Sequence, residues 1–202
     1  MMPWHQKIIL FFFPLCIIWS FIGTVSIGNW VLEISPVLVA LPIVFYLDYK
    51  HRIRLSNFSY FCVYLYLLFP IVQAHYGVAM VPSGFALGEW LGVHRNMFDR
   101  ATHFLFGLLL MLPLLEIFDY VPTKKAFLKY YLALSTILAF SAIYEILEWI
   151  VNVSASSRLS FLFVAAQEDF WDSSKDMAMA AIGALIALFI ILLVRRNKGA
   201  RG

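Results

Sequence analysis

The chain has 202 residues, of which 62% are hydrophobic types and only 13% are charged, and its mean hydropathy is +0.83. A water-soluble domain carries about 25% charged residues, so this composition excludes a disordered chain, a nucleic-acid-binding module and an ordinary soluble enzyme. The formal net charge of +3 is small, but a chain this apolar needs lipid as its solvent, so we expect an integral membrane protein with the lipid bilayer as its partner.

Six apolar runs are long enough to cross a membrane as helices. A helix needs about 20 mostly apolar residues to cross a hydrocarbon core of about 30 Å, and backbone groups cannot stay unpaired in lipid. The predicted fold is an all-α bundle of six transmembrane helices in a single membrane domain, 1–202. In chain order the predicted spans are 8–28, 31–48, 56–76, 99–118, 128–151 and 172–194.

The first span has a competing interpretation as a cleaved signal peptide. Its apolar run is longer than a typical signal core, and no A-x-A cleavage pattern follows it. We therefore expect this span to remain in the protein as a membrane anchor.

Most basic residues lie before the first span, between the second and third spans, around the loop between the fourth and fifth spans, and after the sixth span. Lys and Arg accumulate in cytoplasmic loops, and six crossings place these segments on one side of the membrane. We therefore expect both termini in the cytoplasm. The 11 of 15 basic residues in these segments are Lys7, Lys50, Arg52, Arg54, Lys124, Lys125, Lys129, Arg195, Arg196, Lys198 and Arg201.

Acidic and histidine side chains gather at the predicted outer ends of the helices. Asp99 and His103 are spaced i and i+4, so they share a helix face. Glu145 and Glu148 are spaced i and i+3 and also share a face. The residues expected at a similar depth are His75, Asp99, His103, Glu145, Glu148, Asp169, Asp172 and Asp176.

The sixth span carries two patterns. If its helix begins by Asp169, then Asp169, Asp172 and Asp176 form one acidic stripe. Further along, small residues recur at a spacing of four, which permits close contact with a neighbouring helix. These small residues are Ala180, Gly183, Ala184 and Ala187.

The acidic residues outnumber their basic neighbours. An ionised aspartate in the middle of a membrane helix costs about 2.5–3.5 kcal/mol, and the nearby cations are Arg95, Arg100 and Lys175. Three interpretations remain open: an ion-pair and hydrogen-bond network that joins the helix ends, a divalent metal site, and a proton or ion relay. Oxygen ligands suit Mg²⁺, Mn²⁺ or Ca²⁺, and the histidines would also allow Zn²⁺.

One hypothesis is a metal-dependent enzyme that acts on a lipid or envelope substrate from an outward-facing pocket. Glu145 or Glu148 would then serve as the catalytic general base. Arg95 or Arg100 would bind an anionic substrate group. The candidate metal ligands are His75, Asp99, His103, Asp169, Asp172 and Asp176.

The alternative hypothesis is a transporter or accessory membrane protein, in which the acidic cluster is a proton-linked gate or a structural clamp. Many transporters contain inverted repeats. No such repeat relates residues 1–98 to residues 99–202, because the acidic residues concentrate in the second half.

Three segments resemble a known family. RNMFDRATHF (95–104), YEILEW (144–149) and QEDFWDSSKDMAMAAIGA (167–184) are similar to signature segments of the bacterial YjdF family of inner-membrane proteins. This resemblance implies a multi-pass inner-membrane protein without an assigned activity. A fainter similarity to VanZ-like proteins, in the Asp99-x-x-x-His103-Phe104 segment and the small residues after Asp176, implies a role in cell-envelope chemistry or in resistance to envelope-directed compounds.

The predicted topology places Asp99, Glu148 and Asp176 near the outer surface. Accessibility labelling of cysteines substituted at these positions should therefore report one side of the membrane for all three. Labelling from opposite sides would remove the shared site.

Overall fold

The fold is built from helices, as the composition predicts. The computed structural model describes residues 3–50, 53–123, 125–164, 167 and 169–199, and it is 84% helical with no strand in these residues. Six helical segments are long and apolar enough to cross a membrane, which confirms the predicted all-α class and the six spans. They are Trp4–Phe21, Ile27–Tyr49, Asn57–Tyr76, Phe98–Phe118, Ala126–Ser154 and Asp172–Asn197. The side of the membrane on which the termini lie stays a prediction.

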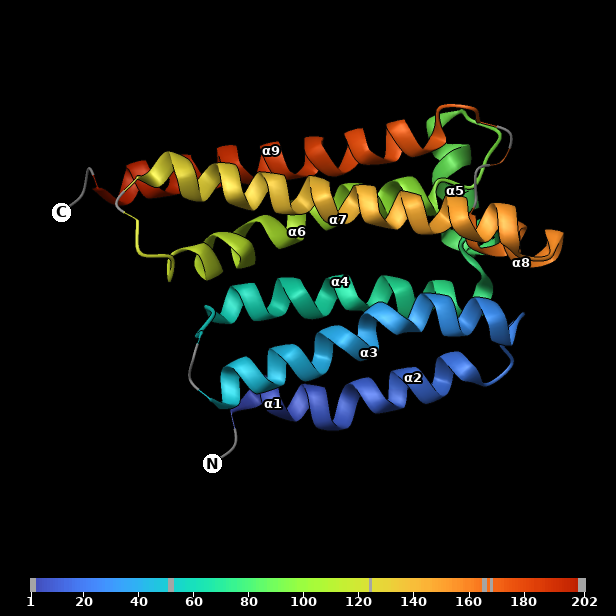
Figure 1. The fold of residues 1–202 in the computed structure, drawn as a ribbon, viewed down its shortest axis with the longest axis horizontal. Helices are drawn as coiled ribbons and strands as arrows, with labels where there is room; N and C mark the ends of the chain where they lie inside the picture. Colours follow the sequence, from blue (N-terminus) through green and yellow to red (C-terminus); the bar gives the residue numbers. More distant parts are fainter. Residues whose placement is uncertain (1–2, 51–52, 124, 165–166, 168, 200–202) are drawn as a thin grey trace. The chain divides into compact units, whose positions relative to one another are not determined.

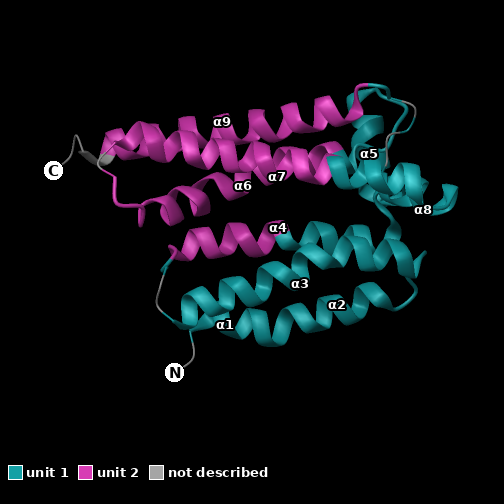
Figure 2. Cartoon of the chain, viewed as in Figure 1, with its two compact units in different colours: residues 1–54, 67–99, 146–170 teal, residues 55–66, 100–145, 171–202 magenta. Residues whose placement is uncertain are grey.

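The chain divides into two compact units, which Figure 2 shows in teal and magenta. Unit 1 contains Met1–Arg54, Leu67–Asp99 and Ile146–Phe170. Unit 2 contains Leu55–Tyr66, Arg100–Glu145 and Trp171–Gly202. Three of the boundaries fall within helices α4 (Asn57–Tyr76), α6 (Phe98–Phe118) and α7 (Ala126–Ser154), so these helices contribute residues to both units.

Unit 1 begins with a helical segment that has an irregular turn. It consists of α1 (Trp4–Lys7), the π-helix η1 (Ile8–Phe12) and α2 (Phe13–Phe21). Pro14 lacks a backbone N–H and its ring would clash with the carbonyl of Leu10, so a wider turn at this point relieves the clash. The segment ends at Phe21 and not at residue 28 as the apolar run suggested, because Gly23 adopts a φ of +74° and turns the chain.

The remainder of unit 1 surrounds a small core. Ser26 caps the N-terminus of helix α3 (Ile27–Tyr49), because its hydroxyl oxygen accepts a hydrogen bond from the backbone N–H of Asn29. Further elements of unit 1 follow in the chain. They include the later part of α4, the 3₁₀ turn η2 (Val78–Met80), α5 (Pro82–Leu91) and α8 (Ser157–Val164). The buried core residues of this region are Val78, Ala79, Val81 and Phe98.

Unit 2 is a helical bundle whose main members are α6, α7 and α9 (Asp172–Gly199), and Figure 1 shows these helices running lengthwise beside one another. Large apolar side chains on the outside, such as Phe140 and Phe189, are 58% and 63% exposed, as expected for a surface that faces lipid. The buried core consists of Met111, Leu115, Ala133, Ile137, Ala180, Ala184 and Ala187.

Helices α6 and α9 approach each other through glycines. A Cβ atom on Gly107 would lie 1.9 Å from the carbonyl oxygen of Ala180, and one on Gly183 would lie 2.1 Å from that of Phe104. Real Cβ atoms do not come this close to backbone atoms, so neither position accepts a side chain without moving a helix. The contact confirms that the small residues of the sixth span permit close packing.

Gly183→Leu should therefore destabilise the bundle, because backbone atoms of α6 cannot yield as a flexible side chain can. We expect the free energy of unfolding to fall by about 3 kcal/mol or more, measured as thermal unfolding of the purified protein in detergent. Ala178→Leu is the matched control, since Ala178 lies on the exposed face of α9. Equal stability of the two variants would contradict the close contact.

Candidate functional site

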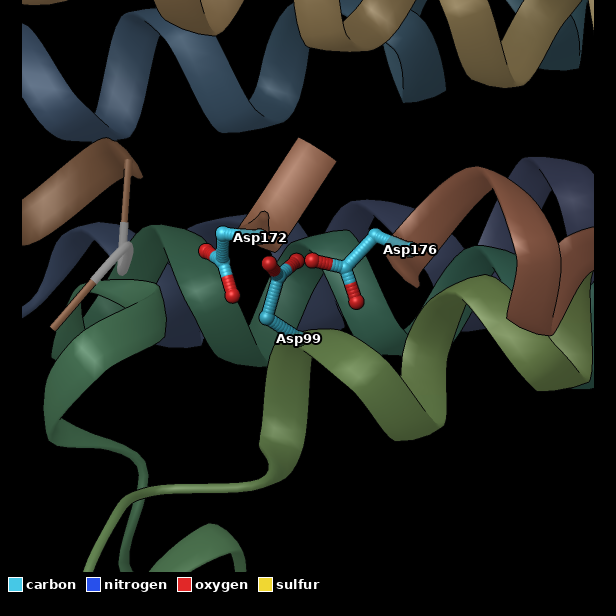
Figure 3. Close-up of side chains that lie close together, drawn as sticks. All are labelled: Asp99, Asp172 and Asp176. Carbon is cyan, nitrogen blue, oxygen red and sulfur yellow. The ribbon is translucent and has the colours of Figure 1, made fainter. Parts of the chain in front are cut away.

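The candidate site lies at the N-terminal ends of α6 and α9. Oxygen atoms of Asp99, Asp172 and Asp176 lie within 4.8 Å of one another, and Figure 3 shows the three carboxylates converging. The side chains are buried, with exposed fractions of 2%, 5% and 1% respectively. Asp99 is the last residue of unit 1, but it precedes Arg100 within α6, so this helix fixes its position beside the unit 2 residues.

Arg100 joins the two helices through a pair of ion pairs. Its Nη2 atom lies 2.6 Å from Oδ1 of Asp172, and its Nε atom lies 3.1 Å from Oδ1 of Asp176. The two aspartates are spaced i and i+4 in the first turns of α9 and therefore present their carboxylates on one face. The planar guanidinium has several donors in fixed directions, which lets one arginine serve both acids.

A second polar group joins α6 to α7. His103 has Nδ1 at 3.1 Å from the Ser141 hydroxyl and Nε2 at 3.1 Å from Oε1 of Glu145. Ser141 and Glu145 are spaced i and i+4 on α7, so both face the imidazole. The contact with Oε1 lacks hydrogen-bond geometry, and among the described residues no donor satisfies this buried atom. The Ser173 side chain hydrogen-bonds to the Glu145 carboxylate.

The site has more acidic than basic groups. Four buried carboxylates, those of Asp99, Glu145, Asp172 and Asp176, surround the single guanidinium of Arg100. Within this group Arg100 contacts Asp172 and Asp176 directly, and a proton on His103 would place a second positive charge beside Glu145. Buried charges are costly unless they are paired, so this site favours the binding of a further cation or of protons.

Other predicted site residues lie in unit 1 and make a separate contact between loops. Arg95 forms an ion pair of 3.1 Å with Asp169. Asp169 precedes α9, which begins at Asp172, so the three aspartates do not form one helical stripe. Beside this pair, the backbone N–H of Asn96 donates to Oε1 of Gln167 at 2.8 Å, and Nε2 of Gln167 donates to the backbone carbonyl oxygen of Asn96 at 2.9 Å.

His75 and Glu148 also belong to unit 1. His75 lies in the last turn of α4, where its ring stacks on Trp19 with ring centroids 4.7 Å apart and its Nδ1 lies 3.3 Å from the Ser20 carbonyl oxygen. Glu148 is 3% exposed and lies one turn beyond Glu145 in α7. The catalytic, substrate-binding and metal-binding roles assigned from the sequence remain predictions.

Sequence reasoning missed four residues of these networks: Ser141, Ser173, Asn96 and Gln167. Ser141 could have been found from its spacing of four residues before Glu145. Asn96 and Gln167 lie in the segments that carry the family resemblance, and nothing else in the sequence pointed to a role for them.

Comparisons with known proteins agree with this architecture. The model of a family described as "Predicted membrane protein (DUF2238)" matches residues 5–197. Inner membrane protein YjdF of Escherichia coli (strain K12) is 32% identical over 166 residues, which are 81% of this chain and 77% of that protein. No solved structure matches the chain. The predicted resemblance and the inner-membrane location are thereby confirmed.

Removal of the Arg100 guanidinium should destabilise unit 2, because Asp172 and Asp176 would lose their counter-charge in a buried position. For Arg100→Gln we expect a loss of about 3–5 kcal/mol in the free energy of unfolding, measured by thermal or denaturant unfolding in detergent. Arg196→Gln removes the same charge from an exposed position of α9 and should have little effect. Adding Asp172→Asn and Asp176→Asn to Arg100→Gln should recover part of the loss. Equal stability of Arg100→Gln and Arg196→Gln would contradict the role of the ion pairs.

Proposed function

We propose that this chain, which belongs to the DUF2238 family of predicted membrane proteins, is a metal-dependent enzyme acting on a lipid or envelope substrate at the bacterial inner membrane. The observation that carries the proposal is the convergence of Asp99, Asp172 and Asp176, three buried carboxylates with oxygens within 4.8 Å of one another. The buried Oε1 of Glu145, which lacks a hydrogen bond within the described structure, is an independent observation that favours a cation beside the cluster.

The dimensions of the cluster suit a divalent cation. Oxygen ligands lie about 2.0–2.6 Å from Mg²⁺ or Ca²⁺, so ligand atoms on opposite sides of one ion are about 4–5 Å apart. Oxygen atoms of the three carboxylates lie within 4.8 Å of one another, which is close enough for all three to contact one ion. Each carboxylate has two oxygens, so Asp172 and Asp176 can contact Arg100 with one oxygen and bind a cation with the other.

The charge balance supports the same occupant. Arg100 offsets one of the four negative charges, and a divalent ion would offset two more. Oxygen-rich ligands favour Mg²⁺, Mn²⁺ or Ca²⁺, whereas Zn²⁺ would require His103 as an additional ligand. Such an ion would supply either activation of water or binding of phosphate oxygens.

The chain's own residues would supply proton transfer and orientation. Glu145 would be the general base, and His103 beside it would hold or accept a proton at Nε2. Ser141 fixes the opposite side of the imidazole through Nδ1. Arg100 keeps two acidic ligands in place on α9, and Arg95 remains the candidate for an anionic substrate group.

A second candidate function is a structural clamp in an accessory membrane protein. The observation that favours it is the double ion pair of Arg100, which joins α6 to α9 without any further cation. In this case the carboxylates stabilise the bundle and would retain protons in place of a metal.

Metal binding distinguishes the two candidates. Purified full-length protein in detergent should bind Mg²⁺, Mn²⁺, Ca²⁺ or Zn²⁺ stoichiometrically, and a saturating ion at about 100 times its Kd should stabilise the fold by about 2.7 kcal/mol. Elemental analysis and thermal unfolding with and without added ion measure the two effects. Asp172→Asn/Asp176→Asn should abolish both, because two of the three ligands are lost.

Glu89→Gln is the control, since Glu89 is an exposed carboxylate on α5, and it should retain both effects. Wild-type protein that holds no metal and is not stabilised by any of the four ions would overturn the enzyme proposal in favour of the clamp.

A further inference from the structure

A hollow of about 360 Å³ opens at the other end of unit 2, away from the acidic cluster. The last turn of α6, the first turns of α7 and the last turns of α9 form its walls, and Figure 1 shows these three helix ends near the C-terminus of the chain. Its volume lies within the range of about 300–1,000 Å³ that is usual for ligand pockets. The lining residues are Leu115, Asp119, Thr123, Ala126, Lys129, Tyr130 and Arg195.

Two cations and one anion line this hollow. The ammonium of Lys129 lies 3.0 Å from Oδ1 of Asp119, and Nη2 of Arg195 lies 3.9 Å from Oδ2 of the same residue. One carboxylate therefore faces two basic side chains, which leaves a net positive charge on the hollow. The side chain of Asp119 is 49% exposed, so its ion pairs are screened by water and weak. A stronger anion can replace this carboxylate between the two cations.

The other lining residues favour an amphiphilic ligand. Leu115 belongs to the core of unit 2, and Tyr130 packs against that core. Both line the hollow and make its inner wall apolar beside the charged groups. The hollow lies where one span ends at Phe118, another begins at Ala126 and a third ends at Asn197. Helix ends of this kind lie at the level of the lipid headgroups.

We propose that Lys129 and Arg195 form a binding site for the phosphate group of an anionic phospholipid, with its acyl chains along the apolar sides of α6 and α7. Basic pockets between membrane helices bind anionic headgroups, and arginine and lysine are the side chains that recognise phosphate. The basic segments at this end predict the cytoplasmic leaflet. The proposal does not depend on the acidic site or on its function.

The test measures lipid binding to the purified full-length protein by native mass spectrometry, with phosphatidylglycerol as the anionic lipid and phosphatidylcholine as the neutral one. The wild type should retain phosphatidylglycerol in preference to phosphatidylcholine. Each lost cation should weaken this binding about fivefold, so Lys129→Gln/Arg195→Gln should lower the affinity roughly 20-fold. Arg196→Gln is the matched control, because Arg196 neighbours Arg195 in α9 but does not line the hollow.

Asp119→Asn separates a binding site from a simple ion-pair network. Removal of the competing carboxylate should raise the affinity for phosphatidylglycerol several-fold, because both cations then face the phosphate alone. Equal losses in Lys129→Gln/Arg195→Gln and in Arg196→Gln, or an unchanged or lowered affinity in Asp119→Asn, would overturn the proposal.

The source of the phosphate is tested with water-soluble competitors. Glycerol 3-phosphate and inorganic phosphate, at concentrations that match the lipid, should not displace phosphatidylglycerol, since they lack the acyl chains. Displacement by either of them would overturn the assignment to a lipid and identify a site for a soluble phosphate.

Discussion

The low polarity of the membrane makes charge compensation the constraint on which unit 2 depends. Four carboxylates, those of Asp99, Glu145, Asp172 and Asp176, are buried among its helices, where leaving their charges uncompensated is costly. Arg100 meets this need for Asp172 and Asp176 by joining α6 to α9. Arg100 contacts two of the four acids directly, and protons or a bound cation would add to this compensation.

Close helix packing determines whether Arg100 can reach its partners. Gly107 follows Arg100 by seven positions on α6, and Gly183 follows Asp176 by seven positions on α9. Two turns of each helix, about 10 Å, therefore lie between the ion pairs and the glycine contact. Because the helices are parallel in this region, the glycines set both the distance and the register at which the side chains of the site meet. The small residues and the charged residues of α9 thus form one functional arrangement.

The sequence predicted the spans and the spacing of the polar residues within them, but not the direction in which each helix presents these residues. Hydropathy and charge located six spans, and helical spacing correctly paired Asp172 with Asp176 on one face. Periodicity within one helix says nothing about which neighbour that face meets. For this reason His75 was grouped with the acids, whereas it stacks on Trp19 in unit 1. Ser141 shares a helix face with Glu145 by its spacing, but this spacing does not show that the face meets His103.

Helix direction explains where the remaining negative charge is least compensated. Asp99 and Asp172 lie in the first turns of α6 and α9, where the partial positive charge of the helix N-terminus stabilises an anion. Asp176 has Arg100 as a direct partner. Glu145 lies within α7, more than two turns before the end at Ser154, and has Ser173 and His103 beside it and the charge of Arg100 nearby. A proton on His103 would therefore interact directly with Glu145, and through it the charge balance on α7 is connected to that on α9.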